Sequence, residues 1–143
     1  MVKLKLWLRA VGTFYLVQFV LNVFVSAPIR AIGPKGALDQ AAAGDPLARF
    51  LVDSWVIASL EIGAIGAVLW FASRRPEQAR VLVWTIIAIE LARGIIADIY
   101  LIVRGNDITV SLIWIVIHSV VIATGFLVLR TSRGTEGQST VGL

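Results

Sequence analysis

Four long apolar stretches fill most of this 143-residue chain, and no proline interrupts any of them. A hydrocarbon layer of about 30 Å needs about 20 apolar residues in helical form. Inside that layer only a helix or a closed barrel satisfies the backbone hydrogen bonds. Hydrophobic residues make up 58% of the chain, more than the core of one small soluble domain can bury. The sequence therefore predicts an all-α integral membrane protein with spans near residues 7–28, 50–72, 81–103 and 108–129.

Capping residues support these boundaries. Asp45 and Pro46 have the pattern of an N-cap and a first-turn proline at the start of the second span. Pro76 opens the third span, and Asp107 caps the fourth. Because the loops around the third span are short, its neighbours must run antiparallel to it. We therefore expect a four-transmembrane-helix antiparallel bundle.

The remaining segments define the domain organisation. Residues 1–130 form one transmembrane domain, since neither a boundary nor a repeat divides it. The long loop of residues 29–49 is expected to hold a short helix. Residues 131–143 are polar and small, which predicts a disordered tail.

The distribution of Lys and Arg predicts the orientation. Eight of them flank one side of the spans, in the N-terminal segment, the loop before the third span and the tail; four flank the other side. Cytoplasmic loops carry the excess of basic residues. We therefore expect both termini in the cytoplasm.

Composition excludes several classes of function. The chain has no cysteine, so it has no disulfide, thiolate metal site or thiol nucleophile. A bis-histidine haem would need a homodimer, since there is one histidine and the single methionine is the initiator. The net charge of +4 comes from basic residues beside the apolar stretches, not from one aromatic-rich basic patch, so no nucleic-acid partner is expected. We expect no metal and no cofactor.

The third span carries three charges that a bilayer disfavours, Glu90, Arg93 and Asp98. Each costs about 2.5–3.5 kcal/mol at a helix centre, whereas an Ile, Leu or Val returns only about 0.3–0.6 kcal/mol. The span is therefore expected to insert stably only if the charges find partners. Glu90 and Arg93 are three residues apart and can pair, and Asp98 projects about 80° around a regular helix from Glu90. The side of the helix that carries these three charges, its polar arc, is expected to face the bundle interior.

Every predicted span carries a polar residue near its midpoint, which predicts a shared internal polar layer. The outward halves of the helices are also more polar than the inward halves, as in a funnel open to the outside. The candidates for ligand binding or proton relay are Glu61, Glu90, Arg93 and His118. The supporting polar residues are Gln18, Asn22, Asp53, Asp98 and Ser111.

Structural roles compete with these functional ones. Glu90 with Arg93 can be an ion pair that fixes helix rotation, and His118 can be a core histidine that donates to a carboxylate. Glu61 has no cation within one turn of its own helix, so it must be protonated, paired with Arg93 or His118, or hydrated. Gln18 and Asn22 can hold helices together by hydrogen bonds.

Three segments of the sequence, LWLRAVGTFYLVQFVLN, DPLARFLVDSWVIASLEIGAIG and WTIIAIELARGIIADIYLIVRG, resemble the BphX-like family of small bacterial four-span membrane proteins. The resemblance extends from about residue 6 to residue 130. It rests on the length of the chain, the number of spans and the spacing of the polar residues within them. It implies a multi-pass protein of the bacterial inner or plasma membrane, and it assigns no catalytic residue.

Two classes of function and one structural role remain open. In the first, the bilayer-embedded funnel binds or transports a small amphipathic molecule, with Arg93 or His118 at its polar end and Glu61 or Glu90 exchanging protons. In the second, the protein is a membrane-embedded enzyme, an isomerase or cyclase, in which His118 and Glu61 exchange a proton with the substrate. In the third, the polar layer only specifies helix pairing. A homo-oligomer is compatible with each, since the polar arc could face a second copy.

Overall fold

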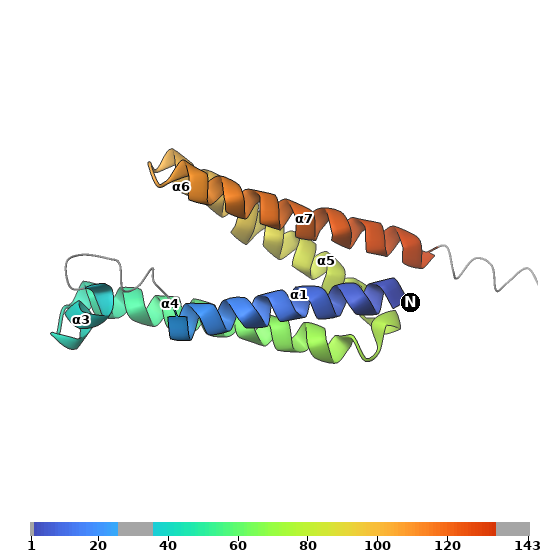
Figure 1. Ribbon diagram of the computed structural model, residues 1–143, viewed down its shortest axis with the longest axis horizontal. Helices are drawn as coiled ribbons and strands as arrows, with labels where there is room; N and C mark the ends of the chain where they lie inside the picture. The colour runs from blue at the N-terminus through green and yellow to red at the C-terminus, as the bar shows by residue number, and fades with distance from the viewer. Residues whose placement is uncertain (1, 26–35, 134–143) are drawn as a thin grey trace, which may run out of the picture. The chain divides into compact units, whose positions relative to one another are not determined.

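The computed structural model describes residues 2–25 and 36–133. Within these ranges the chain consists of helices joined by short turns and contains no strand (Figure 1). This confirms the predicted all-α class. In chain order the elements are α1 (Val2–Val20), the π-helix η1 (Leu21–Val25), α3 (Gly36–Ala42), α4 (Pro46–Ala72), the 3-10 helix η2 (Pro76–Gln78), α5 (Arg80–Ile89), the π-helix η3 (Glu90–Ile96), α6 (Ala97–Val103) and α7 (Ile108–Arg133).

Three helices in the described part of the chain are long and apolar enough to cross a membrane: Val2–Phe24, Pro46–Ala72 and Ile108–Thr131. They keep large apolar side chains on the surface, as in α7, where Val116 is 62% exposed. Such continuous apolar surface suits contact with acyl chains rather than with water. The structure therefore indicates a membrane protein with at least these candidate spans.

The third predicted span is helical over its whole length, from Arg80 to Val103, but it is not a regular α-helix. The backbone stays in the right-handed helical region at both junctions, so α5, η3 and α6 follow one another without a break. The π-helical turns contain Glu90 and Arg93. Pro76 starts the short helix η2 rather than the span itself, which begins four residues later.

Capping hydrogen bonds confirm two of the predicted helix starts. The Asp45 carboxylate accepts the backbone N–H groups of Leu47 and Ala48 at 2.8 and 2.9 Å. Asp107 accepts those of Thr109 and Val110 at 2.8 and 3.1 Å. Each carboxylate satisfies donors that a helix N-terminus leaves without a partner.

The predicted loop helix exists as α3, within the long connection before α4. At the other end of the chain, α7 continues to Arg133, three residues into the segment predicted as tail. The end of the first predicted span and the rest of the tail fall on residues 26–35 and 134–143, outside the described residues.

The described helices belong to two compact units. Unit 1 comprises Met1–Ala10 and Phe71–Leu143, and unit 2 comprises Val11–Trp70. In unit 2, α1 and α4 run antiparallel, because Gly12 of α1 meets Gly66 whereas Phe19, further along α1, meets the earlier Gly63. A Cβ added at Gly66 would lie 2.9 Å from the carbonyl oxygen of Gly12, which shows how closely the two backbones approach. Small residues permit this approach between helices in a membrane.

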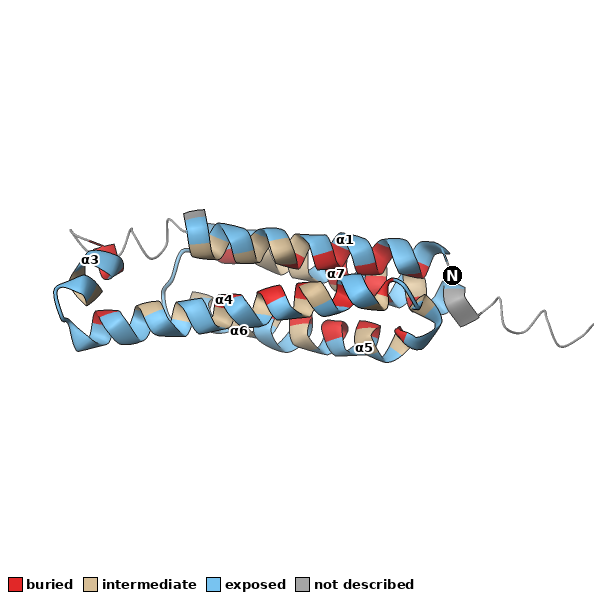
Figure 2. Ribbon diagram, turned by 90° about the horizontal axis from the view of Figure 1, so that it is seen from below, coloured by how far each residue is buried: buried red, intermediate tan, exposed pale blue. Residues whose placement is uncertain are grey.

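In unit 1, α5, η3 and α6 pack against α7 in an antiparallel pair (Figure 1). The N-terminal turns of α1 join them at the end where α7 finishes. Trp7 is buried and donates from Nε1 to Thr124 Oγ1 at 3.0 Å, and its ring packs over Gly125. Arg9 donates to Ser73 Oγ at 3.4 Å, just after α4. Buried residues, red in Figure 2, recur at intervals along α1, α5 and α7.

Candidate functional site

His118 of α7 lies between two carboxyl groups of the facing helix, both within unit 1. Its Nδ1 is hydrogen bonded to Glu90 Oε2. On the other side of the ring, Nε2 lies 3.7 Å from Asp98 Oδ2. The first contact is a hydrogen bond, whereas the second is a charge contact too long for a direct hydrogen bond. One imidazole therefore connects two acidic side chains eight residues apart.

The π-helix η3 brings these two acids onto one face. In a regular α-helix, positions 90 and 98 differ by about 80° around the axis. A π-helical turn takes in an extra residue through its wider hydrogen-bonding pattern. One extra residue removes about 100°, so the two carboxyl groups come within about 20° of each other. The wider turn thus explains why both acids, and not Glu90 alone, face His118.

Gly94 provides the space for the imidazole ring. It is buried midway between Glu90 and Asp98. A Cβ at this position would lie 2.6 Å from Nδ1 and 2.7 Å from Cδ2 of His118. Because any larger residue would collide with the ring, the glycine determines how closely α7 approaches η3 at this level.

Trp114 supports the ring, and Ser111 lies on the same face of α7. Trp114, one turn before His118, stacks on the imidazole with centroids 5.9 Å apart and an interplanar angle of 29°. Ser111 lies seven residues before His118 and is buried. The indole restricts rotation of the imidazole, so the two ring nitrogens stay aligned with the two acids.

Exposure differs across the cluster. The Glu90 side chain is 1% exposed, whereas those of His118 and Asp98 are 17% and 14% exposed. The series Glu90, His118 and Asp98 therefore runs from a buried carboxyl group to two side chains that reach the molecular surface.

The contacts of His118 depend on where protons lie. An imidazolium can donate to both carboxylates at once. A neutral imidazole has one donor and one acceptor, so it can satisfy a carboxylate on one side only and needs a protonated group on the other. Moving a proton along this chain thus exchanges donors and acceptors while leaving the heavy atoms almost in place. The arrangement is suited to holding and passing a proton.

The structure brings together some of the sequence-predicted residues. Glu90 and Asp98 each contact His118, and Ser111 lies on the same face of α7 as His118. Arg93 lies on η3, is more than one third exposed and also has an interaction partner. Asp98, predicted only as a supporting residue, is a member of the cluster.

The other candidates lie in unit 2. Asn22 accepts a hydrogen bond from Trp55 Nε1 through its backbone carbonyl at 3.2 Å, so its contact in this unit is structural. Gln18 is half-buried, and Asp53 and Glu61 are exposed. Glu61 also has a polar interaction. Over residues 2–25 and 36–133, no group of three or more His, Asp or Glu side chains is placed to hold a metal ion.

Sequence reasoning missed the part played by Gly94 and by the π-helix. The spacing itself carried a signal, because an acid, a glycine and an acid follow one another at intervals of four residues from Glu90 to Asp98. That pattern places a gap between two carboxyl groups on one helix, and a ring from a neighbouring helix can occupy it.

Fold and site together describe a small helical protein with three candidate membrane spans and an acid–histidine–acid cluster inside one helical pair. The chain belongs to the BphX-like family, whose model matches residues 1–134. It is similar to an uncharacterized BphX-like protein of Burkholderia cepacia and to another of Paraburkholderia xenovorans (strain LB400). Each is 31% identical to it over 125 residues, which cover 85% of this chain and 86% of the relative. No solved structure gives a significant match.

Proposed function

We propose that the protein is a four-span bundle of the bacterial inner or plasma membrane with both termini in the cytoplasm. Three helices are candidate spans, and the segment from Arg80 to Val103, third in chain order, completes the four. At about 1.5 Å per residue its length suffices to cross the hydrocarbon layer. The contacts of Glu90 and Asp98 with His118 support this reading, because paired groups enter a bilayer at lower cost than isolated charges.

Within that bundle, we propose that Glu90, His118 and Asp98 form a proton-binding relay linked to the binding or transport of a small amphipathic molecule. The observation that carries this proposal is the imidazole between two carboxyl groups, one sealed and one reaching the surface. A purely structural pair needs one acceptor for the histidine. Here the ring faces two acids, so the number of protons that the cluster holds can change without breaking the helix contact.

The relay would work by alternating its donors. A proton arriving from the surface reaches Asp98 and passes to Nε2 of His118, through one bridging water or a small rotation that closes the 3.7 Å gap. The imidazolium then donates from Nδ1 to Glu90, which can take that proton in turn. Return of the proton from Glu90 to Nδ1, transfer of the Nε2 proton back to Asp98 and its release from Asp98 to the surface restore the first state. Proton passage along the three groups requires each of them.

The chemistry around the outer end of the relay favours a ligand with a polar and an apolar part. Asp98 and His118 offer charge and hydrogen bonds, and the Trp114 ring lies against the imidazole. The exposed Ile99 and Tyr100 follow Asp98 on α6. A cationic or hydrogen-bonding head beside Asp98 with an apolar body against the helices would satisfy both. Arg93, on η3 of the same unit, remains a candidate for polar contact with that head.

The single histidine offers a direct test. The protein is purified with a histidine-free tag, labelled with ¹⁵N-histidine, and its ring nitrogens are followed by NMR across pH. We expect Glu90→Gln to alter the Nδ1 signal and Asp98→Asn to alter the Nε2 signal, with Glu77→Gln, an acid of η2, as the matched control. If both site variants give the wild-type signals at every pH, the relay is refuted.

Native mass spectrometry of the extracted protein tests the linked ligand. We expect a retained small molecule in the wild type and its loss in Asp98→Asn and His118→Gln, but not in Glu77→Gln. Reconstituted in liposomes with an enclosed pH-sensitive dye, the wild type is expected to move protons only when that molecule is added. Conversion of the molecule without net movement would identify an enzyme instead. If no molecule is retained and no protons move, the cluster has a structural role.

A further inference from the structure

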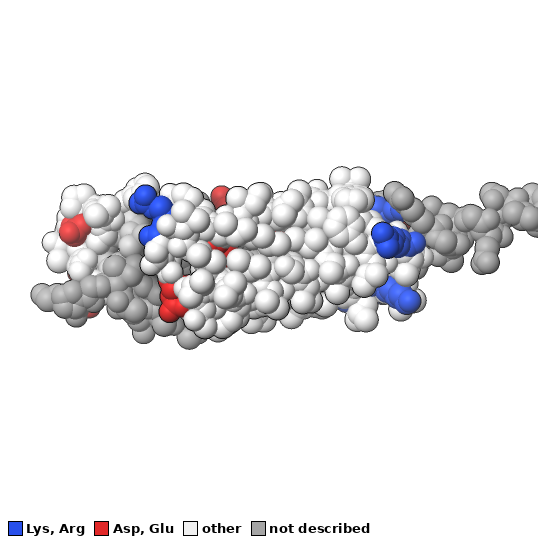
Figure 3. Space-filling model, turned by 90° about the horizontal axis from the view of Figure 1, so that it is seen from above, with Lys and Arg blue, Asp and Glu red and all other residues white. Residues whose placement is uncertain are grey.

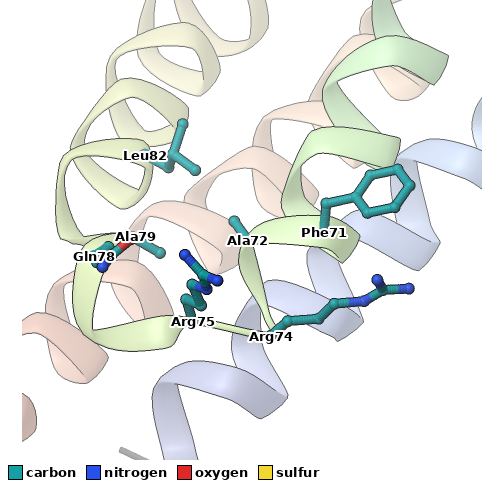
Figure 4. A pocket seen from close by; sticks show the side chains of 7 residues that line it. All are labelled: Phe71, Ala72, Arg74, Arg75, Gln78, Ala79 and Leu82. Carbon is teal, nitrogen blue, oxygen red and sulfur yellow. The ribbon is translucent and has the colours of Figure 1, made fainter.

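A basic hollow lies in unit 1 where α4 ends and α5 begins. Its polar side chains are Arg74, Arg75 and Gln78, and its apolar wall includes Phe71 and Leu82, with two alanines completing the lining (Figure 4). Its volume of about 460 Å³ falls in the range of small-ligand sites, roughly 300–1,000 Å³. The hollow is open on one side, so a ligand can reach it from the surface.

The two arginines are held differently. Arg74 extends along Phe71, with its guanidinium carbon 5.2 Å from the ring centroid, a cation–π arrangement. Arg75 points up between α4 and α5, toward Leu82 (Figure 4). Neither pairs with a carboxylate among residues 2–25 and 36–133. Arg75 therefore keeps its five N–H donors available inside a hollow.

Further positive charge surrounds the hollow. The Arg9–Ser73 hydrogen bond brings the N-terminal turns of α1 beside it, and Arg80 begins the next helix. Glu77 is the only acid in the segment from Phe71 to Leu82. Lys and Arg side chains gather at this end of unit 1 (Figure 3). The local field therefore attracts an anion.

The position of the hollow relative to a membrane follows from α4. That helix is long and apolar enough to cross, and it ends at Ala72, which lines the hollow. The hollow thus lies at the level where the span leaves the hydrocarbon layer. Phe71, 65% exposed, and Val81, 74% exposed, continue the apolar surface on either side of it.

We propose that this hollow binds an anionic phospholipid, with Arg75 holding the phosphate and the acyl chains lying along Phe71 and Val81. Arginine presents paired donors that match phosphate oxygens, and basic pockets between helices at the cytoplasmic surface suit anionic headgroups. A free phosphate would use the arginines but not the apolar wall. A zwitterionic lipid would use the wall but bring a second positive charge to a basic site. The inference is independent of the proton relay.

Native mass spectrometry with added lipid tests the proposal. The protein in detergent is titrated with phosphatidylglycerol and, separately, with phosphatidylcholine of the same chains. We expect stoichiometric binding of phosphatidylglycerol, weakened about tenfold in Arg75→Gln and further in the double variant with Arg74→Gln, since loss of a charged hydrogen bond is worth about one tenfold step. Arg75→Lys is expected to recover part of the affinity, because it restores charge without the paired donors.

Arg104→Gln is the matched control, since it removes one exposed arginine from the loop after α6. It is expected to leave phosphatidylglycerol binding unchanged. Equal affinity for the two lipids, or equal loss in Arg104→Gln and Arg75→Gln, would overturn the proposal. Displacement of the lipid by millimolar glycerol phosphate would instead identify a site for soluble phosphate. Thermal unfolding of each variant in detergent confirms that a loss of binding is not a loss of fold.

Discussion

The imidazole of His118 lies directly over the backbone of Gly94, so that a Cβ at residue 94 would come within 2.6 Å of its Nδ1. The same ring is held on one side by Glu90 and on the other by Asp98. It has little freedom to move away, because Trp114 stacks on it. The glycine, the ring and the two acids form one packed unit, and none of the four can change size without displacing another.

Gly94→Ala is therefore expected to destabilise the protein and to displace His118. Overpacking a well-packed position costs about 1–3 kcal/mol, and the ring cannot relax without losing a carboxylate contact. Thermal unfolding in detergent, followed by circular dichroism, measures the cost. The ¹⁵N signals of His118 report the displacement.

Gly125→Ala is the appropriate comparison. Its added Cβ would meet Ile87 and Trp7 at 3.2 Å, a contact that small side-chain shifts can relieve. It is expected to have a smaller effect on stability and to leave the histidine signals unchanged. If both alanine variants behave alike, the close fit of His118 over residue 94 is wrong.

Thr124→Val tests the hydrogen bond that ties α1 to α7 in unit 1. The substitution keeps the shape but removes the hydroxyl that accepts from Trp7 Nε1 at 3.0 Å. Because Trp7 is buried, its N–H would lack a partner, at a cost of about 1–3 kcal/mol. Thr85→Val, whose hydroxyl bonds only to the carbonyl of Val81 at 3.0 Å on its own helix, is the control. Equal unfolding temperatures for the two variants would argue against the Trp7 contact.

Asp107→Ala tests the start of α7. Loss of an N-cap costs about 1 kcal/mol, and Asp107 accepts two backbone donors of the first turn. Asp107→Asn is expected to retain most of the stability, since asparagine caps helices about as well. Thermal unfolding of the two variants gives the comparison. An equal loss in the two variants would show that charge, rather than capping, determines the effect.

Most of the helical architecture could be predicted because it depends on local properties of the sequence. Apolar length determines which segments can cross a bilayer, and the capping residues Asp45 and Asp107 mark helix starts by forming hydrogen bonds with their own neighbours. The π-helix η3 could not be predicted in this way. Its extra residue is favoured by a contact with another helix, made when His118 occupies the space over Gly94.

Some residues of the site could be predicted because they too depend on local properties of the sequence. Glu90 and His118 could be singled out because polar groups in apolar segments need partners. Their pairing depends on which sides of α7 and η3 pack against each other, and no local sequence pattern determines that. Arithmetic on a regular helix placed Asp98 about 80° from Glu90, and only the wider turn aligns the two acids. The burial of Trp7 is likewise a property of the packed helices, since its indole N–H donates to Thr124 Oγ1.

The two carboxyl contacts of His118 are expected to differ in strength, and double-mutant cycles can separate them. Glu90 is sealed and forms a hydrogen bond, so its coupling with His118 is expected to be about 2 kcal/mol. Asp98 is more exposed and 3.7 Å away, so its coupling is expected to be below about 1 kcal/mol. The cycles use Glu90→Gln, Asp98→Asn and His118→Gln, with unfolding in mixed micelles as the readout. Couplings of equal size would mean that the ring is centred between the acids. A larger coupling for Asp98 would mean that the Asp98 end of the relay, and not the Glu90 end, is closed to the surface.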